Sequence, residues 1–312
     1  MAVIFAGGEL SSFTRFNAIE TTTEGVFASP ARCGVHTKKG GYIRTDGLAG
    51  QSELWVHLDL HVALITPSFT PIRISNSNGV TLFSIASDGK VYVGTTPIGN
   101  SPLFVPGRVT LDIYLRGGAS GLVEIYANSQ VVFSANGNFA LSGMQTLMLS
   151  PTGSDVTENT GTVYSQVIVA NEITIGSKLA TLTLDTVGSN NSWTGTSSNA
   201  AADVNEIGLD DSTYIFAQTA GLVETWHTSD LDPKYSNIRA VVVSALGKYS
   251  ASGPKNLDAV VRINGADYYT GMTTLGPGYT PSTAIFNANP VTNASWKPAE
   301  VNAAEFGIRS KG

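Results

Sequence analysis

The sequence carries little charge, and this scarcity excludes two classes of partner. Only 13% of its 312 residues are charged, with 18 Lys and Arg against 24 Asp and Glu and a formal net charge of −6. Proteins that bind nucleic acid or anionic lipid need clustered cations, whereas the densest basic spot here is the pair Lys38-Lys39. No apolar run approaches the ~18 residues that a membrane-spanning helix needs. We therefore expect no nucleic-acid partner and no membrane insertion.

Cysteine, histidine and familiar catalytic motifs are scarce as well. Cys33 is the only cysteine, so no disulfide can form within the chain and stability must come from packing. The sequence contains no Gly-x-Ser-x-Gly, no His-Glu-x-x-His and no phosphate-binding loop. Four histidines are present, and nothing in their spacing supports a Ser-His-Asp site. A lone cysteine without a nearby base is typical of packing rather than of a nucleophile.

Runs in which apolar and polar residues alternate are abundant, and they predict strands. Residues 54–65 read LWVHLDLHVALI, with Leu and Val on one face and Trp55, His57, Asp59 and His61 on the other. Asn-Gly pairs at 78–79 and 264–265 separate further alternating runs, as in β-hairpins. No long amphipathic helix is evident, although residues 298–306 could form a short helical turn. Evenly spaced strands and turns are the signature of sandwiches and jelly rolls.

The strand pattern predicts an all-β protein of two jelly-roll-like β-sandwich domains in tandem, preceded by an extended N-terminal arm. We assign residues 1–41 to the arm, 42–184 to the first sandwich and 214–312 to the second. Residues 185–213 are poor in large apolar side chains and rich in Gly, Ser, Thr and Asn, so we expect a linker there. Short apolar patches in the arm predict that it pairs with the first sandwich or with an adjacent subunit.

Two resemblances add to this interpretation. Residues 42–175 resemble a concanavalin A-like or laminin G-like jelly roll in the strand LWVHLDLHVALI, the hairpin SNGVTLFSI, the pair LVEIYANSQVVF and the closing segment VYSQVIVANEITIG. The whole chain resembles virion structural proteins of tailed bacteriophages. The segments that carry this second resemblance are Tyr164–Ala170, Trp193–Gly195, Val204–Glu206 with Asp210-Asp211, Phe286-Asn287, Asn289–Thr292, Trp296, Val301–Ala303 and Phe306–Arg309.

The phage resemblance implies a place in a virus particle rather than a mechanism. It implies a structural protein of the tail tip, baseplate or tail appendage, assembled in the host cytoplasm. The implied partners are other virion proteins and copies of the chain itself, with host-surface polysaccharide as a further contact. Two alternatives stay open, namely a capsid decoration or head-fibre protein, and a carbohydrate-binding receptor-binding protein.

Aromatic residues in turn-rich segments are candidates for glycan stacking or for subunit contacts. Tyr268 and Tyr269 are neighbours on one predicted strand, so only one of them can be exposed. Trp296 could equally plug the base of the second sandwich. The full candidate set is Trp193, Tyr268, Tyr269, Tyr279 and Trp296.

Two polar clusters are candidates for a metal site. Four carboxylates, Asp203, Glu206, Asp210 and Asp211, lie within nine residues of each other in the predicted linker, where Ca²⁺ could bind; a solvated acidic loop is the alternative. His57, Asp59 and His61 share one strand face at two-residue spacing, where they could bind a metal or form a subunit contact. No other cofactor is expected.

Jelly-roll families include glycoside hydrolases, which need two carboxylates flanking the sugar. No strand of this sequence carries an alternating acidic set. Glu53 and Asp59 are six positions apart, and Glu124 is the only acid in its strand. From this pattern we expect a protein that is not an enzyme.

Overall fold

The computed structural model describes residues 2–22, 34–62, 70–101, 107–149, 162–197, 199–206, 211–250 and 252–312. Within these residues the all-β prediction is confirmed, and the one α-helix is the short α1 (Pro298–Ala303) in the segment where a helical turn was considered. No described helix is long and apolar enough to cross a membrane. The chain divides into two compact units, Met1–Glu9 with Phe13–Leu179 and Leu10–Ser12 with Ala180–Gly312, and each is described by itself.

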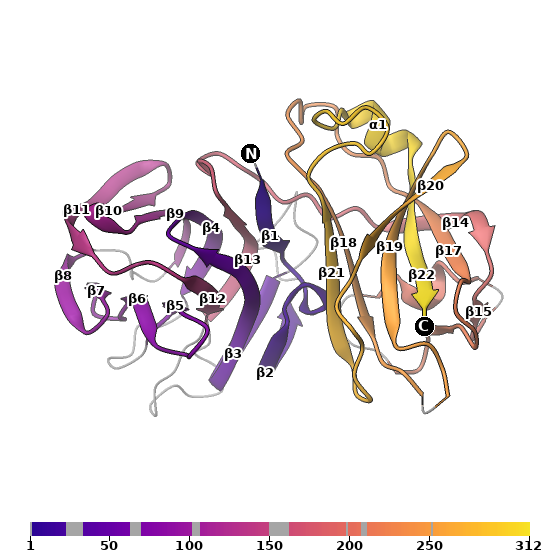
Figure 1. Ribbon diagram of the computed structural model, residues 1–312, viewed down its shortest axis with the longest axis horizontal. Helices are drawn as coiled ribbons and strands as arrows, with labels where there is room; N and C mark the ends of the chain where they lie inside the picture. Colours follow the sequence, from indigo (N-terminus) through magenta and orange to yellow (C-terminus); the bar gives the residue numbers. More distant parts are fainter. Residues whose placement is uncertain are drawn as a thin grey trace. The chain divides into compact units, whose positions relative to one another are not determined.

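The first unit is built on one large antiparallel sheet (Figure 1). Its strand order is β11-β10-β9-β4-β13-β3-β12-β5-β6-β7-β8, while β1 pairs with β13 and β2 with β3. The strands are β1 (Val3–Gly7), β2 (Arg15–Thr22), β3 (Gly34–Gln51), β4 (Glu53–Val62), β5 (Ile72–Ser75), β6 (Thr81–Ile85), β7 (Lys90–Val93), β8 (Thr96–Asn100), β9 (Gly107–Arg116), β10 (Gly118–Ala127), β11 (Gln130–Phe139), β12 (Met144–Leu149) and β13 (Thr162–Ala170).

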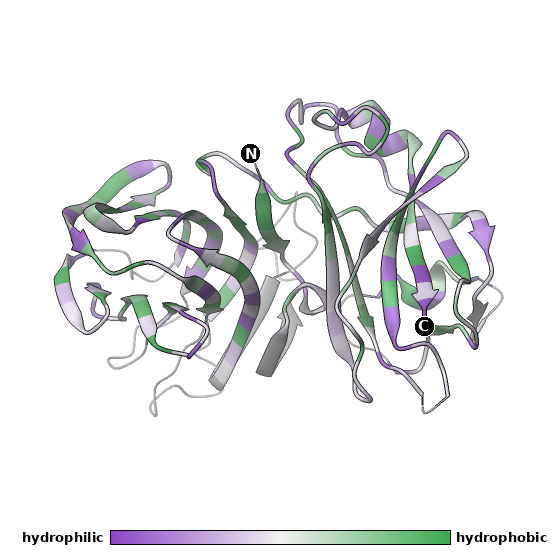
Figure 2. Cartoon of the chain, viewed as in Figure 1, coloured by the Kyte–Doolittle hydropathy of each residue, from purple (hydrophilic) through white to green (hydrophobic). Residues whose placement is uncertain are grey.

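The two ends of this strand order come together, because Phe133 of β11 lies against Gly99 of β8. A Cβ atom on Gly99 would lie 2.6 Å from the Phe133 ring, so only glycine permits this approach. The sheet thus folds over on itself, and its enclosed face carries the apolar residues that alternate along the strands. Those of the central strands are fully buried: Leu54, Val56, Leu58, Leu60, Leu111, Ile113, Leu115, Val123 and Ile125. Figure 2 shows the alternation of hydrophobic and hydrophilic residues along strands of both units.

The predicted arm is part of the first unit rather than an extension from it. β1 pairs antiparallel with β13, with Phe5 opposite Val169, so the predicted pairing of the arm with the first sandwich is confirmed. Residues 34–41 are the beginning of β3. Phe5 and Phe13 are buried, and their ring centroids lie 5.4 Å apart. Cys33 lies outside the described residues.

The second unit contains a five-stranded antiparallel sheet of order β14-β17-β22-β19-β20 and two strand pairs, β18-β21 and β15-β16. Its core holds Trp296, Phe286, Phe306 and Val301, with a smaller cluster around Trp226. The strands are β14 (Leu184–Asn191), β15 (Thr194–Gly195), β16 (Ile215–Phe216), β17 (Val223–Thr228), β18 (Val241–Gly247), β19 (Asn256–Ile263), β20 (Ala266–Gly271), β21 (Thr280–Phe286) and β22 (Glu305–Lys311).

The predicted linker at residues 185–213 is wrong. β14 pairs with β17 as an edge strand of the second sheet, and the division between the units falls after Leu179. Glycine is needed at position 188 of β14, because a Cβ atom there would lie 2.4 Å from Glu305 Oε2 and 2.7 Å from Thr225 Oγ1. A strand that needs glycine for close approach has the composition of a linker.

Candidate functional site

The outward-facing side chains of β4, β9 and β10 form one continuous surface on the first unit, which we call the polar face. Directly opposite residues of neighbouring strands share a face of the sheet. Across β4, β9 and β10, one row of opposed residues is Trp55, Tyr114 and Glu124. The next row is His57, Asp112 and Tyr126. The polar face consists of Glu53, Trp55, His57, Asp59, Thr110, Asp112, Tyr114, Arg116, Glu124 and Tyr126.

One end of the polar face is aromatic. The Trp55 ring stacks on Tyr114 at a centroid distance of 4.8 Å and an interplanar angle of 29°, and it lies 5.8 Å from the Tyr126 ring. The Tyr114 hydroxyl donates a hydrogen bond of 2.7 Å to Glu53, and the Tyr126 hydroxyl donates one of 2.8 Å to Glu124. Glu53 is exposed, and Trp55, Glu124 and Tyr126 are partly exposed. This aromatic end therefore presents ring surface and two carboxylates to solvent.

Both tyrosine hydroxyls at the aromatic end stay protonated. Burial, with the nearby Glu124 carboxylate, raises the pKa of Tyr126 to about 12. Burial and the Glu53 carboxylate also raise the pKa of Tyr114. Each hydroxyl therefore acts as a donor that holds its glutamate in place, and each glutamate keeps further lone pairs to accept hydrogen bonds.

The other end of the polar face is buried. His57, Asp59 and Asp112 are each 0% exposed, although β4 alternation placed the first two on a polar outer face. His57 Nδ1 lies 2.9 Å from Asp112 Oδ1, which also accepts a 2.7 Å hydrogen bond from the Thr174 hydroxyl. His57 Nε2 and Asp112 Oδ2 are buried with no hydrogen-bond partner.

Asp59 is the best-satisfied group at the buried end. It accepts hydrogen bonds from Arg108 at 2.6 Å, from Thr110 at 2.5 Å and from Gln166 at 2.5 Å. Burial alone would raise the pKa of Asp59, but the hydrogen bonds from Thr110 and Arg108, with the Arg108 charge, hold it below its ordinary value. Gln166 reaches Asp59 from an irregularity in β13, where its own φ is 52°.

These contacts replace the metal site that was considered for this strand. His57 pairs with Asp112 and Asp59 with Arg108, while His61 lies further along β4, opposite Arg108. Among the described residues, no group of three His, Cys, Asp or Glu side chains is placed to hold a metal. The predicted clustering of His57, Asp59 and His61 around an ion is therefore not what the structure shows.

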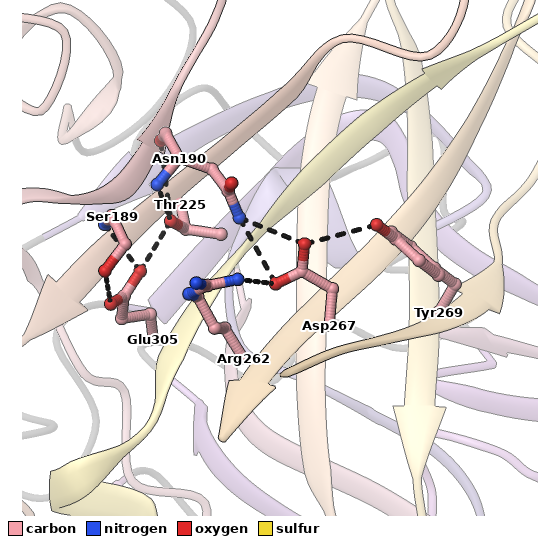
Figure 3. Close-up of polar contacts among 7 residues, drawn as sticks. All are labelled: Ser189, Asn190, Thr225, Arg262, Asp267, Tyr269 and Glu305. Atoms are coloured by element: carbon pink, nitrogen blue, oxygen red, sulfur yellow. Dashed lines mark hydrogen bonds and ion pairs between the residues drawn. The ribbon is translucent and has the colours of Figure 1, made fainter. Parts of the chain in front are cut away.

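A second polar surface lies on the five-stranded sheet of the second unit (Figure 3). We call it the polar ladder. Glu305 accepts from Ser189 N at 2.7 Å, Ser189 Oγ at 2.5 Å and Thr225 Oγ1 at 2.7 Å. Asp267 accepts from Arg262 at 2.6 Å and from Asn190 at 3.2 Å. The seven residues drawn in Figure 3 are Ser189, Asn190, Thr225, Arg262, Asp267, Tyr269 and Glu305.

The predicted aromatic candidates lie in the second unit, and one of them is fully buried. Trp296 is 1% exposed and donates from its indole nitrogen to the Phe286 carbonyl oxygen at 3.0 Å. Of the two roles considered for Trp296, the structure supports the plug of the second core. Trp193 is partly exposed, donates to the Leu222 carbonyl oxygen and packs against the core cluster around Trp226.

The tyrosine candidates have cationic neighbours. Tyr268 and Tyr269 point to opposite faces of β20, as predicted, and Tyr269 is 40% exposed. The Arg309 guanidinium lies 3.6 Å from the centroid of the Tyr269 ring, so one face of that ring is covered. Lys248 lies 4.2 Å from the centroid of the Tyr279 ring.

The structure does not bring the predicted calcium ligands together. Asp203 is 2% exposed and accepts a 2.9 Å hydrogen bond from Ser197 N, which lowers its pKa. Glu206 accepts from the Thr213 hydroxyl, and Asp211 is exposed near Lys248. Asp210 lies outside the described residues. The described members are therefore engaged separately, with Asp203 alone in the short 3-10 turn at Ala202–Val204.

Sequence reasoning missed Asp112, Tyr114, Glu124 and Tyr126 of the polar face, and Gln166, which reaches Asp59 from β13. A signal was available for the first four, because alternation along RVTLDIYL and LVEIYA places them on the face away from the core. Their meeting with Trp55 and His57 depends on the strand order β10-β9-β4, which local pattern does not encode.

Comparison with known proteins gives matches in structure only. No family model and no curated protein matches the sequence. An endo-beta-1,4-glucuronan lyase from the fungus Trichoderma reesei is similar with a TM-score of 0.41 and 10% identity, over 56% of this chain and 98% of that chain. A domain of an extracellular arabinanase from Geobacillus stearothermophilus, in complex with arabinotriose, is similar with a TM-score of 0.39 and 13% identity, over 54% and 91%. A cellulose-induced protein is similar with a TM-score of 0.38 and 11% identity, over 50% and 90%.

The prediction that the chain is not an enzyme does not stand, because the pattern on which it rested is not what the sheet shows; the similar structures include a lyase and a domain of an arabinanase. The sequence argument failed because it looked for paired carboxylates along single strands. The sheet instead places Glu53 of β4 and Glu124 of β10 on one face, with β9 between them. Likeness at these levels of identity concerns the fold and assigns no reaction.

Proposed function

We propose that this chain binds glycans through the aromatic end of its polar face. The observation that carries the proposal is the stack of Trp55 on Tyr114, with Tyr126 beside it and a glutamate fixed at each tyrosine hydroxyl. An apolar ring surface bordered by fixed carboxylates matches a sugar, whose C–H faces stack on aromatic rings and whose hydroxyls donate to carboxylates.

The rigidity of the aromatic end supports the same conclusion. Trp55 and Tyr114 are a directly opposed pair on adjacent strands, and their ring stacking removes rotamer freedom before any ligand arrives. Side chains that are ordered in the free protein lose less entropy on binding. Figure 1 shows that β9 and β10, two of the three strands that carry the aromatic end, run side by side in the sheet.

A binding assay with defined oligosaccharides tests the proposal. The full chain would be titrated calorimetrically with the hexasaccharides of cellulose, xylan, mannan and chitin. We expect at least one to bind, and Trp55→Ala to weaken that binding by about 30-fold or more, as loss of a central aromatic anchor does. Tyr269→Ala, which removes an exposed ring in the second unit, is the matched control and should leave the affinity unchanged. No binding of any hexasaccharide, or equal affinity of the Trp55→Ala variant, would contradict the proposal.

We also propose that the glycan-binding chain is a component of a tailed-phage particle, carried at the tail tip, baseplate or a tail appendage. The support is the resemblance of its C-terminal segments, from Phe286 to Arg309, to virion proteins. The test is gold-labelled antibody against this chain on intact particles. Label at the distal tail is the expected result. Label over the head would replace the tail assignment with capsid decoration, and unlabelled particles would contradict the virion proposal altogether.

A further inference from the structure

The buried end of the polar face is covered by the segment Asn171–Leu179, which we call the strap. Several hydrogen bonds attach the strap: Asn171 Oδ1 accepts from Ala2 N at 2.9 Å, the Thr174 hydroxyl donates to Asp112 at 2.7 Å, and Leu179 N donates to Gln166 at 3.2 Å. Between these points it makes a tight turn, where Ser177 N donates to the Thr174 carbonyl oxygen. A segment with no strand or helix of its own opens at lower cost than the sheet beneath it.

Unpartnered polar atoms gather under and within the strap. His57 Nε2, Asp112 Oδ2 and Ser177 Oγ are each buried without a hydrogen-bond partner. A buried polar atom without a partner costs about 1–3 kcal/mol, and such atoms are rare in native proteins. His57 and Asp112 are both 0% exposed, so bulk water cannot form hydrogen bonds with their unpaired atoms.

Each unpaired atom of the His57–Asp112 pair is suited to a hydroxyl group of its own. Asp112 Oδ1 is occupied by His57 Nδ1 and by Thr174, which leaves Oδ2 as an acceptor. The imidazole presents Nε2 on the side of the ring away from Asp112, so one hydroxyl cannot reach both atoms. One hydroxyl can therefore donate to Asp112 Oδ2, and a second hydroxyl can bind at His57 Nε2.

The pair also adjoins the aromatic end. Asp112 lies directly opposite Tyr126 on β10, and His57 is two residues from Trp55 on the same face of β4. The Asp112 charge contributes to the raised pKa of Tyr126, which shows that the two groups are electrostatically close. A sugar stacked on the aromatic rings would place its next hydroxyls toward this pair.

We propose that His57 Nε2 and Asp112 Oδ2 form a subsite that binds two sugar hydroxyls, one at each atom, and that the strap closes this subsite until a glycan displaces it. The proposal rests on glycan binding at the aromatic end. It assigns that end the stacking of the sugar ring, and it assigns the His57–Asp112 pair the recognition of hydroxyls.

The direct test is nitrogen NMR of the His57 ring in the full chain, labelled with ¹⁵N, with and without the hexasaccharide of the panel that binds best. We expect Nε2 to shift on binding while Nδ1, held by Asp112, stays near its free position. His57→Gln should weaken binding by about tenfold, the factor that corresponds to the loss of one hydrogen bond. If the hexasaccharide binds His57→Gln as well as wild type and leaves Nε2 unmoved, the subsite is wrong while glycan binding stands.

The strap is tested separately, without glycan, by the rate at which diethyl pyrocarbonate modifies His57. Thr174→Val keeps the shape of the side chain and removes its hydrogen bond to Asp112, so we expect modification of His57 to become several-fold faster. Thr274→Val is the matched control, because it removes a 2.7 Å hydroxyl hydrogen bond to Asn256 in the second unit. Equal rates in wild type and Thr174→Val would overturn the role of the strap, and failure of every hexasaccharide to bind would overturn the glycan proposal on which the subsite rests.

Discussion

The two polar surfaces of this molecule differ in how completely their groups are paired. In the polar ladder of the second unit, Glu305 accepts three hydrogen bonds and Asp267 is held by Arg262 and Asn190 (Figure 3). None of the seven residues in that figure has a buried side-chain atom without a partner. The polar face of the first unit leaves His57 Nε2 and Asp112 Oδ2 buried and unpaired.

This difference teaches which surface serves stability and which serves binding. A buried polar network that is fully satisfied rigidifies the fold, whereas one that is partly satisfied costs free energy that function must justify. The ladder also offers little free ring surface, because Arg309 covers one face of Tyr269. The polar face, in contrast, combines unpaired atoms with a partly exposed aromatic stack. The following predictions separate the two roles.

The largest effect is expected from Gly307→Ala in the sheet that carries the polar ladder. Gly307 lies on the central strand β22, and a Cβ atom there would come within 1.9 Å of the Glu224 carbonyl oxygen. Backbone atoms of a neighbouring strand cannot rotate away, so we expect a loss of about 3 kcal/mol in the free energy of unfolding. Urea denaturation measures this loss. Gly278→Ala, where a Cβ atom meets nothing within 4 Å, is the control and should unfold at nearly the wild-type urea concentration.

Glu305→Ala should follow, with a loss of about 2–3 kcal/mol. The substitution removes the acceptor of three hydrogen bonds from Ser189 and Thr225 and leaves those donors unpaired in a site where Glu305 is 8% exposed. Asp185→Ala, which removes an exposed carboxylate from β14, is the control. Glycan affinity should be the same in both variants. A Glu305→Ala variant of full stability and lowered glycan affinity would reverse the roles assigned to the two surfaces.

Acid should destabilise both units. Interactions with Arg309 and Lys311 outweigh burial and hold the pKa of Asp258 below its ordinary value, and Ser189 and Thr225 do the same for Glu305. The pKa of Asp59 in the first unit is lowered as well. A carboxyl group whose pKa is lowered in the folded state stabilises the fold above its unfolded pKa, about 4, and this stabilisation is lost as pH falls through the folded value. The melting temperature should therefore fall steadily below about pH 4. A melting temperature that holds steady or rises in this range would contradict the ionised pairing.

The smallest effect is expected from Tyr126→Phe at the aromatic end. It keeps the ring and removes the hydroxyl that donates to Glu124, so stability should fall by about 1 kcal/mol. Because Glu124 is then free to rotate, glycan affinity should fall by about three- to fivefold, less than for Trp55→Ala. Tyr92→Phe, on a strand outside the polar face, is the control for both measurements. A Tyr126→Phe variant that loses stability but binds glycan like wild type would show that Glu124 takes no part in binding.

Local pattern predicted much of the fold. Alternation along residues 54–65 identified the core face of β4, and the Asn-Gly pair at 264–265 identified the turn between β19 and β20, where Asn264 has a φ of 51°. Local pattern failed for the edge strand β14, where Gly188 lies too close to Glu305 and Thr225 for a side chain and so looks like a residue of a linker.

The candidate site was harder to predict than the fold, because it depends on contacts between distant residues. His57 and Asp59 were expected on an open face, yet both are buried. Gln166 reaches Asp59 from 107 residues further along the chain, and Thr174 bonds to Asp112, the partner of His57. Trp296 was considered both as a binding ring and as a core plug, and it fills the second core, while Trp193 packs partly buried against the cluster around Trp226. The Trp55–Tyr114 stack requires the pairing of β4 with β9, which alternation within either strand does not specify.

The central claim is that glycan binds at the aromatic end of the polar face. One NMR titration tests it most directly, because the four tryptophans report on both units. Trp55 lies on the polar face, whereas Trp193, Trp226 and Trp296 pack within the second unit. In a ¹H–¹⁵N spectrum of the full chain, titrated with the hexasaccharide that binds best, we predict that the indole resonance of Trp55 shifts progressively while the other three stay in place. A shift confined to the tryptophans of the second unit, with Trp55 unmoved, would contradict the account.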